Sequence, residues 1–113
     1  MCTKITLNEI TNKVVEVASD CLGNELDRVI LYGSYARGDY DGESDIDIMI
    51  LANIPKEDAD QLDIQLTRFA SCLGLENDIV ISLFVKDCET FYKFLPADPF
   101  YQNVMKDGVL LNA

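Results

Sequence analysis

The chain of 113 residues contains no histidine, and its few cysteines are scattered. Without histidine, a Ser-His-Asp or Cys-His mechanism within this chain is excluded, and so is a mixed Cys/His zinc site. No Cys-x-x-Cys pair occurs among Cys2, Cys21, Cys72 and Cys88, which argues against zinc binding through sulfur. Cys21 and Cys72 fall on the apolar faces of expected helices. We therefore expect them to be small buried hydrophobic side chains, as in a protein of the reducing cytoplasm.

Long apolar runs and basic residues are also scarce. The sequence has neither the apolar length of a membrane span nor the basic and apolar segments of an export signal. Nine Lys and Arg stand against twenty Asp and Glu, which gives a net charge of −11. Because affinity for a nucleic-acid backbone depends on clustered Lys and Arg, nucleic acid is not expected as the main partner. We expect most of the acidic residues to form a solvated face, and contact with a basic partner is the alternative for Glu57, Asp58, Asp60 and Asp63.

A Gly-Ser pair follows the short apolar run 29–32 and predicts a turn that can approach a phosphate. Gly33 has no side chain, so backbone N–H groups can come close to an anion there. Ser34 supplies a hydroxyl and can open a helix, whose first turn favours negative charge.

A pair of aspartates follows ten residues later, in a segment whose alternation predicts a strand. Asp45, Asp47 and Met49 share one face of this strand, and the isoleucines between them share the other. Carboxylates at positions i and i+2 have Cα atoms about 6.6 Å apart, so their oxygens can converge on one or two cations. Mg²⁺ suits such a site because it takes oxygen ligands from one or two carboxylates together with substrate phosphates.

Taken together, residues 33–38 (Gly-Ser-Tyr-Ala-Arg-Gly) and 44–47 (Ser-Asp-Ile-Asp) resemble the signature of the minimal nucleotidyltransferases in the DNA polymerase β superfamily. The resemblance is strongest over residues 26–51. It implies Mg²⁺-dependent transfer of a nucleotidyl group from a nucleoside triphosphate, by default ATP, to a hydroxyl, with release of pyrophosphate. By this resemblance Gly33 and Ser34 hold the triphosphate, and Asp45 and Asp47 bind two metal ions. Arg37 either orients phosphate or braces the turn.

The family normally adds a third carboxylate from a later strand. The candidate is Asp78, which immediately precedes the apolar run 79–85 and would act as general base or share the catalytic metal. Glu76, Asp87 and a purely structural Asp78 are the alternatives.

The pattern of apolar residues predicts a single α/β (α+β) domain, residues 1–113, with a three-strand mixed sheet and helices on one side. The length suffices for one core but leaves little room for a second domain. A capping box at Thr6–Glu9 opens the first helix, and Pro55 opens the second. The first helix should end at Gly23 and the second near Gly74, and the strands are expected at 26–32, 44–51 and 79–85.

The C-terminal section, from Glu89 to Met105, is expected to form one or two short helices, before a turn at Gly108 and the apolar residues 109–111. Half of the aromatic residues lie there, and they either pack over the sheet or form a partner surface. These five are Phe91, Tyr92, Phe94, Phe100 and Tyr101.

The small size of the chain leaves no domain for recognising an acceptor, so the acceptor hydroxyl is expected on another protein. Stand-alone members of the resembled family are commonly antitoxins paired with a HEPN-domain ribonuclease toxin, and some adenylylate a tyrosine of that toxin. One alternative is transfer to a small alcohol such as an antibiotic, with the pocket completed by an oligomer. The other is a non-catalytic module that masks a partner. Assembly with itself or with another chain is left open.

Overall fold

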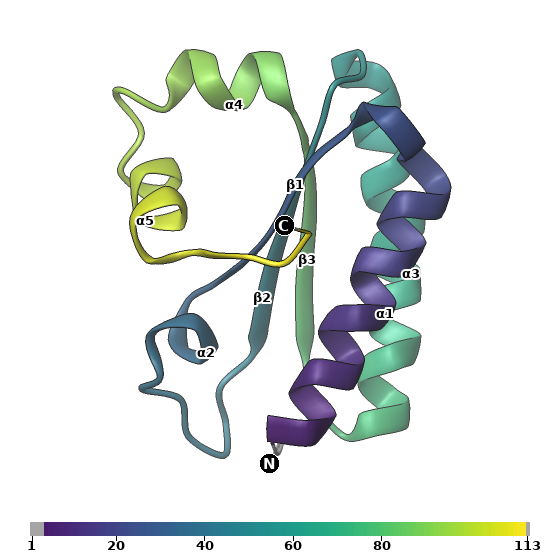
Figure 1. The fold of residues 1–113 in the computed structure, drawn as a ribbon, viewed down its shortest axis with the longest axis vertical. Coiled ribbons are helices and arrows are strands. Elements are labelled where there is room, and N and C mark those ends of the chain that lie inside the picture. The colour runs from purple at the N-terminus through teal and green to yellow at the C-terminus, as the bar shows by residue number, and fades with distance from the viewer. Residues whose placement is uncertain (1–3, 113) are drawn as a thin grey trace.

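A mixed sheet forms the centre of the computed structural model, which describes residues 4–112 (Figure 1). Its order is β3-β2-β1-β4, with β1 and β2 antiparallel, β2 and β3 parallel, and β4 antiparallel to β1. The parallel pair requires a long crossover, which is supplied by a helix. The strands are β1 (Leu26–Tyr32), β2 (Ile46–Ala52), β3 (Ile81–Asp87) and β4 (Val109–Leu110).

Two long helices, α1 (Lys4–Leu22) and α3 (Lys56–Asn77), cover one face of the sheet (Figure 1). The β2 side chains on this face are fully buried, which explains why they are isoleucines. They pack against apolar residues spaced three or four apart on the two helices, the spacing that places side chains on one helical face. The contributing residues include Ile46, Ile48 and Ile50 of β2, Ile10, Val14 and Ala18 of α1, and Leu66, Ala70 and Leu73 of α3.

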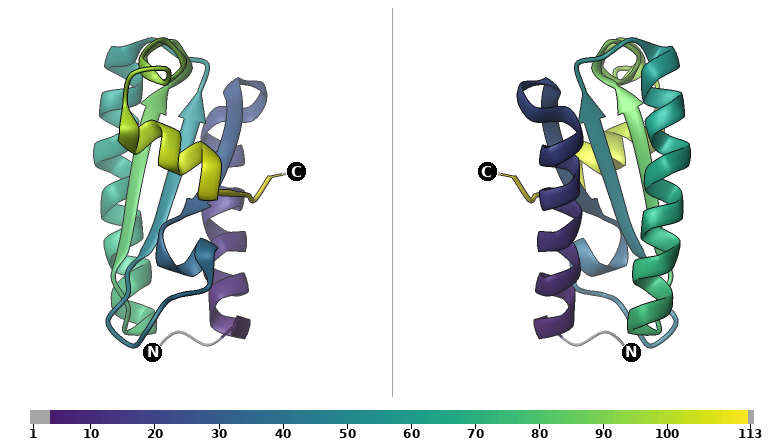
Figure 2. Two further views of the ribbon diagram at one scale, coloured as in Figure 1. Left: turned by 90° about the vertical axis from the view of Figure 1, so that its left-hand side faces the viewer. Right: turned by 90° about the vertical axis from the view of Figure 1, so that its right-hand side faces the viewer.

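The other face carries α4 (Cys88–Phe94) and α5 (Pro99–Asp107) at one end and the short α2 (Ser34–Arg37) at the other. Figure 2 shows α5 crossing this face above α2. Phe91 and Tyr101 are buried against Met49 and Leu51 of β2. Tyr92, Phe94 and Phe100 are exposed, so packing over the sheet is confirmed for part of the set only, and a partner surface stays a prediction for the rest.

The predicted α/β fold and the order of its elements are confirmed, with two differences. The two-residue β4 adds a fourth strand, and α4 and α5 place helices on both faces rather than one. β4 escaped prediction because its pairing partner, β1, lies about 80 residues earlier in the sequence, and a two-residue strand has no periodicity of its own.

Several helix and strand ends differ from the predicted ones. β2 begins at Ile46 rather than at residue 44, so Asp45 lies just before the strand and not within it, and β3 runs on to Asp87. α1 begins at Lys4, so Thr6 lies inside the helix rather than capping it. A short 3₁₀ turn, η1 (Gly23–Glu25), follows its end. α3 continues past Gly74 to Asn77, and the residue that ends it in a left-handed conformation is Asp78. Gly74 serves close packing instead, since it is buried against the backbone of Ile79. The third strand consequently begins at Ile81.

The expected burial of Cys21 and Cys72 was wrong, since both are exposed. Each precedes the leucine that takes the core position, Leu22 or Leu73. Cys88 is buried, and Cys2 lies outside the described residues. Over residues 4–112, the structure has no helix with the length and apolar character needed to cross a membrane.

Candidate active site

The Gly33 turn joins β1 to α2 and lies directly beside Asp47. Gly33 has φ 76° and ψ −154°, a conformation that residues with a side chain rarely adopt. A Cβ atom at this position would collide with the Asp47 carboxylate. The glycine therefore serves two purposes, since it allows the turn and leaves room for the carboxylate.

The aspartate pair lies where β2 begins. Asp47 pairs with Tyr32 of β1 on one side and with Ser82 of β3 on the other, and Asp45 is the residue just before the strand. Burial and the neighbouring charge of Asp45 raise the pKa of Asp47, although Arg37 opposes the shift. Two carboxylates are thus held together with little compensating positive charge.

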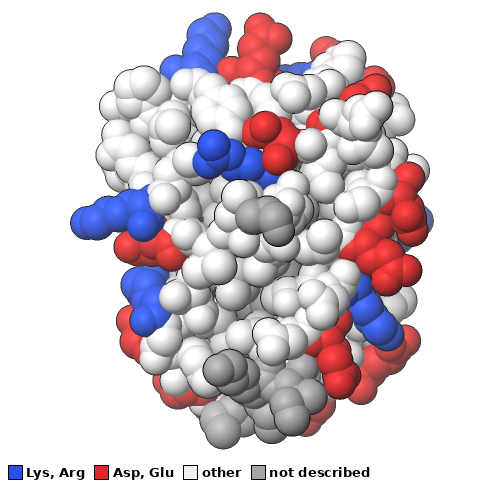
Figure 3. Space-filling model, viewed as in Figure 1, with Lys and Arg blue, Asp and Glu red and all other residues white. Residues whose placement is uncertain are grey.

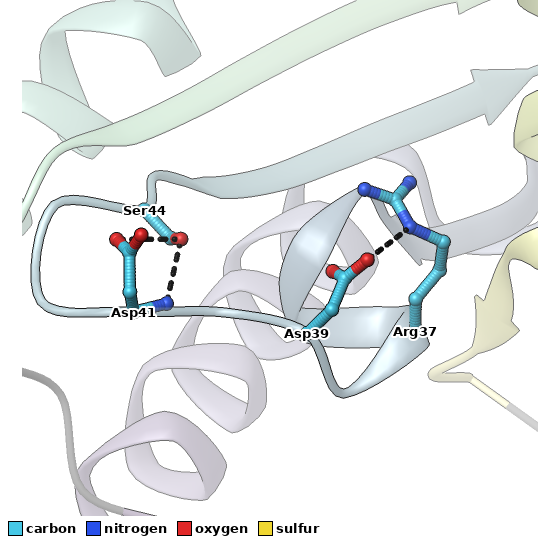
Figure 4. A network of polar contacts seen from close by, with 4 residues as sticks. All are labelled: Arg37, Asp39, Asp41 and Ser44. Carbon is cyan, nitrogen blue, oxygen red and sulfur yellow. Dashed lines mark hydrogen bonds and ion pairs between the residues drawn. The ribbon is translucent and has the colours of Figure 1, made fainter.

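Arg37 lies at the last position of α2, and its guanidinium is near the carboxylates of Asp39 and Asp47. Its Nε donates to Asp39 Oδ2 at 3.2 Å, and both side chains are exposed (Figure 4). The two Nη groups make no hydrogen bond to any residue within 4–112. They remain available to a phosphate, for which a guanidinium is well suited.

The loop between α2 and β2 is ordered by local contacts. Tyr35 is buried and stacks on Tyr40, with ring centroids 4.4 Å apart. Ser44 Oγ accepts from the Asp41 backbone N–H at 2.9 Å and lies 3.3 Å from its carboxylate (Figure 4). Tyr35, Tyr40 and Ser44 thus shape the loop that carries Asp45.

A cavity of about 190 Å³ opens on the β1 side of the aspartate pair. We call it the α5 cavity, because α5 forms one wall and the Gly33 turn the other. It is lined by Tyr32, Gly33, Arg37 and Asp47 and, from α5, by Phe100, Asn103, Val104 and Asp107. Sequence reasoning missed the α5 residues, because nothing in their pattern marks a helix that folds back across the site.

A second recess of about 290 Å³ opens on the β3 side. We call it the α3 recess, because the end of α3 forms part of its wall. Leu75 and Val80 are 85% and 60% exposed at this recess, so it has apolar as well as acidic walls. Its lining is Gly42, Glu43, Ser44, Asp45, Gly74, Leu75, Asp78, Ile79 and Val80.

The three predicted carboxylates are therefore placed differently relative to the two openings. Asp45 and Asp78 line the α3 recess, whereas Asp47 lines the α5 cavity. Asp78 ends α3 in a left-handed conformation, φ 53°, rather than starting β3. Among the described residues, no third carboxylate joins Asp45 and Asp47 in a group able to hold a metal. The β3 residue opposite Asp47 is Ser82.

The chemistry of the pair fits Mg²⁺. The raised pKa of Asp47 reflects burial and a like charge close by, and a cation would relieve the electrostatic cost. Two carboxylates are also enough, since Mg²⁺ completes its coordination with water and substrate phosphates. Asp45 and Asp47 are thus the residues that could hold the metal.

A turn that admits phosphate, an arginine beside it and a paired aspartate on the next strand define a nucleotidyltransferase-type site on an α/β sheet. Comparison with known proteins agrees. Residues 12–111 match the family described as “Nucleotidyltransferase domain”. The chain belongs to this family and is a nucleotidyltransferase.

A relative from Methanocaldococcus jannaschii, named “Putative protein adenylyltransferase MJ0141”, is 45% identical over 75 residues. The alignment covers 66% of this chain and 73% of the relative.

Two solved structures share the fold. A protein from Sulfolobus solfataricus described as a “putative nucleotidyltransferase” superposes with a TM-score of 0.55 at 24% identity, covering 94% of this chain and 79% of that one. The MNT antitoxin complex with a tri-AMPylated HEPN toxin from Shewanella oneidensis gives a TM-score of 0.51 at 25% identity, covering 93% and 69%.

Proposed function

We propose that the chain transfers AMP from ATP to a tyrosine hydroxyl of a HEPN-type toxin and thereby acts as its antitoxin. The observation that carries this proposal is the position of the aspartate pair between two openings. One opening, the α5 cavity, has the features of a phosphate site, and the other, the α3 recess, has apolar walls suited to a protein side chain. The relative named as a protein adenylyltransferase and the AMPylated toxin in the similar complex support the acceptor class.

The donor side holds the triphosphate. Gly33 lets the turn approach the phosphates, Ser34 offers its hydroxyl, and the free Nη groups of Arg37 pair with phosphate oxygens. Asp45 and Asp47 would hold two Mg²⁺ ions, which neutralise charge on the phosphates and favour attack at the α-phosphorus. The role of these residues is to position the donor, which is the main catalytic device in phosphoryl-type transfer.

The acceptor side receives the tyrosine in the α3 recess. Asp78 lines the same recess as Asp45, so it would take the proton of the acceptor hydroxyl. We assign it this role rather than metal binding, because it forms no three-carboxylate group with Asp45 and Asp47 among the described residues. The hydroxyl oxygen then bonds to the α-phosphorus, the bond to the bridging oxygen breaks, and pyrophosphate leaves. The product is an AMP ester of the acceptor.

The test is transfer of label from ATP labelled at the α-phosphate to a HEPN-domain protein that co-purifies with this chain. We expect label on the partner with the wild type and a loss of about 100-fold or more with Asp47→Asn. Asp78→Asn should lose about 100-fold if it acts as base. Glu76→Gln, an exposed neighbour, is the matched control and should transfer normally.

Three results would contradict parts of the proposal. Neutralisation of the toxin by Asp47→Asn without label would make the chain a masking module. Label on a small alcohol but not on the partner would show that the acceptor is a small molecule and not the partner protein. Full activity of Asp78→Asn would leave the aspartate pair as the only carboxylates needed.

A further inference from the structure

The wall that α5 contributes to the α5 cavity has no part in the chemistry described so far. Three residues on one face of α5, Phe100, Asn103 and Asp107, point toward the cavity at intervals of three and four. This spacing places side chains in a row along a helix. The row faces Gly33, Arg37 and Asp47 across the opening.

The two polar side chains of this row, Asn103 and Asp107, have no hydrogen-bond partner among the described residues. Neither the Asn103 amide nor the Asp107 carboxylate makes a hydrogen bond or ion pair within residues 4–112. By contrast, Gln102, the neighbour of Asn103, donates to the carbonyls of Leu95 and Pro96 and serves the structure. Asn103 and Asp107 are therefore free to bind a ligand.

The third member supplies an apolar surface. Phe100 is 46% exposed, and its ring packs edge-on against Tyr32, with centroids 5.7 Å apart. An exposed aromatic ring fixed on one side offers its remaining surface to a planar ligand. The wall thus combines a ring, an amide and a carboxylate.

These three groups match the parts of a nucleoside. A carboxylate accepts hydrogen bonds from ribose hydroxyls, as acidic residues do in dinucleotide sites. An Asn amide carries both donors and an acceptor, the combination that a base edge requires, and aromatic rings stack on bases. The cavity is smaller than most whole-ligand pockets, so it takes one portion of the nucleotide while the phosphates extend toward Gly33 and Asp47.

We infer that the α5 wall of the α5 cavity forms the nucleoside subsite of the enzyme, opposite the phosphate-binding wall at Gly33 and Arg37, with Asp107 on the ribose hydroxyls and Asn103 and Phe100 on the base. This inference rests on the proposed donor site but not on the acceptor. It assigns selectivity for the nucleotide to α5, whereas the residues of the Gly-Ser and Asp-x-Asp motifs contact only phosphate and metal.

Calorimetric binding without any acceptor tests the subsite. Wild type, Asn103→Ala, Asp107→Asn and the control Lys106→Gln, an exposed residue of the same helix outside the cavity, are titrated in Mg²⁺ with ATP and with tripolyphosphate. We expect Asn103→Ala and Asp107→Asn to weaken ATP binding about tenfold while tripolyphosphate affinity stays unchanged. The control should match the wild type with both probes. Thermal unfolding of each variant shows whether the fold is retained.

A second comparison isolates the ribose. The wild type should bind ATP about tenfold more tightly than 2′,3′-dideoxy-ATP, and Asp107→Asn should remove that difference. The inference would be overturned if the variants lost affinity for ATP and for tripolyphosphate equally, or if they lost affinity for neither. If ATP binding behaves as expected but no label reaches the partner, the proposed acceptor fails while the nucleoside subsite stands.

Discussion

At the scale of single residues, the contact between Gly33 and Asp47 ties the two halves of the motif together. The sequence predicted Gly33 from the needs of a phosphate, and the structure adds a second need, room for a carboxylate on the neighbouring strand. That requirement could not be read from the sequence, because it depends on the antiparallel register that places Tyr32 opposite Asp47. A glycine at this position therefore allows the turn and leaves room for the Asp47 carboxylate.

Replacing Gly33 separates these effects when it is compared with Gly38. Both have positive φ, 76° and 85°, but a Cβ atom on Gly38 meets nothing within 4 Å. We expect Gly38→Ala to lower the free energy of unfolding by about 1 kcal/mol through backbone strain alone. Gly33→Ala should cost at least about 2 kcal/mol and abolish AMP transfer, because Asp47 must move. Denaturant unfolding and the label-transfer assay measure the two quantities.

Similar stability and activity in the two variants would show that the Gly33 turn tolerates a side chain.

Asp63 also depends on a contact between segments far apart in the sequence, although it was expected on a solvated face. It is half-buried, and its carboxylate accepts from the Val85 N–H of edge strand β3 at 2.7 Å. Its neighbours in sequence gave no sign of this contact.

At the scale of elements, the long periodic segments were predictable and the short ones were not. α1, α3 and the first two strands follow from apolar spacing, since each buries a continuous face. α5 was expected only as part of a helical stretch, and its place over the site depends on contacts with Met49 and Leu51, far away in the sequence. Packing against the sheet, rather than propensity, positions it.

The start of α5 is fixed by Asp98, whose carboxylate accepts from the Phe100 and Tyr101 N–H groups at 2.9 and 3.3 Å. We expect Asp98→Ala to cost about 1 kcal/mol of stability, because the cap is lost. The melting temperature should fall by about 4 °C, and ATP affinity should fall as well, since α5 forms the wall of the α5 cavity. Asp98→Asn retains a capping oxygen and is the control. Equal melting temperatures for the two variants would show that the cap does not hold the helix.

At the scale of the whole molecule, one face of the sheet forms the main core and the other face carries the candidate active site. Helices α1 and α3 bury one face completely, while the other holds the site between α2 and α5 (Figures 1 and 2). Figure 3 shows acidic side chains along the side formed by α1 and α3. With a net charge of −11, self-repulsion opposes the compact state, and a polyanion would be repelled. The apolar side chains of Leu75 and Val80, exposed among the acidic residues of the α3 recess, are therefore the part of the site best suited to contact an acceptor protein.

The exposed Leu75 at the α3 recess tests this division of the molecule. Because the side chain is 85% exposed, Leu75→Asp should leave the fold and ATP binding unchanged. A charge at the apolar wall should nevertheless reduce AMP transfer to the partner at least about tenfold, since docking would bury it unpaired. Ile64→Asp adds the same charge to an exposed site of the same helix outside the recess and should transfer normally. Equal transfer by both variants would place the acceptor elsewhere, whereas loss in both would point to an effect of added negative charge over the whole surface.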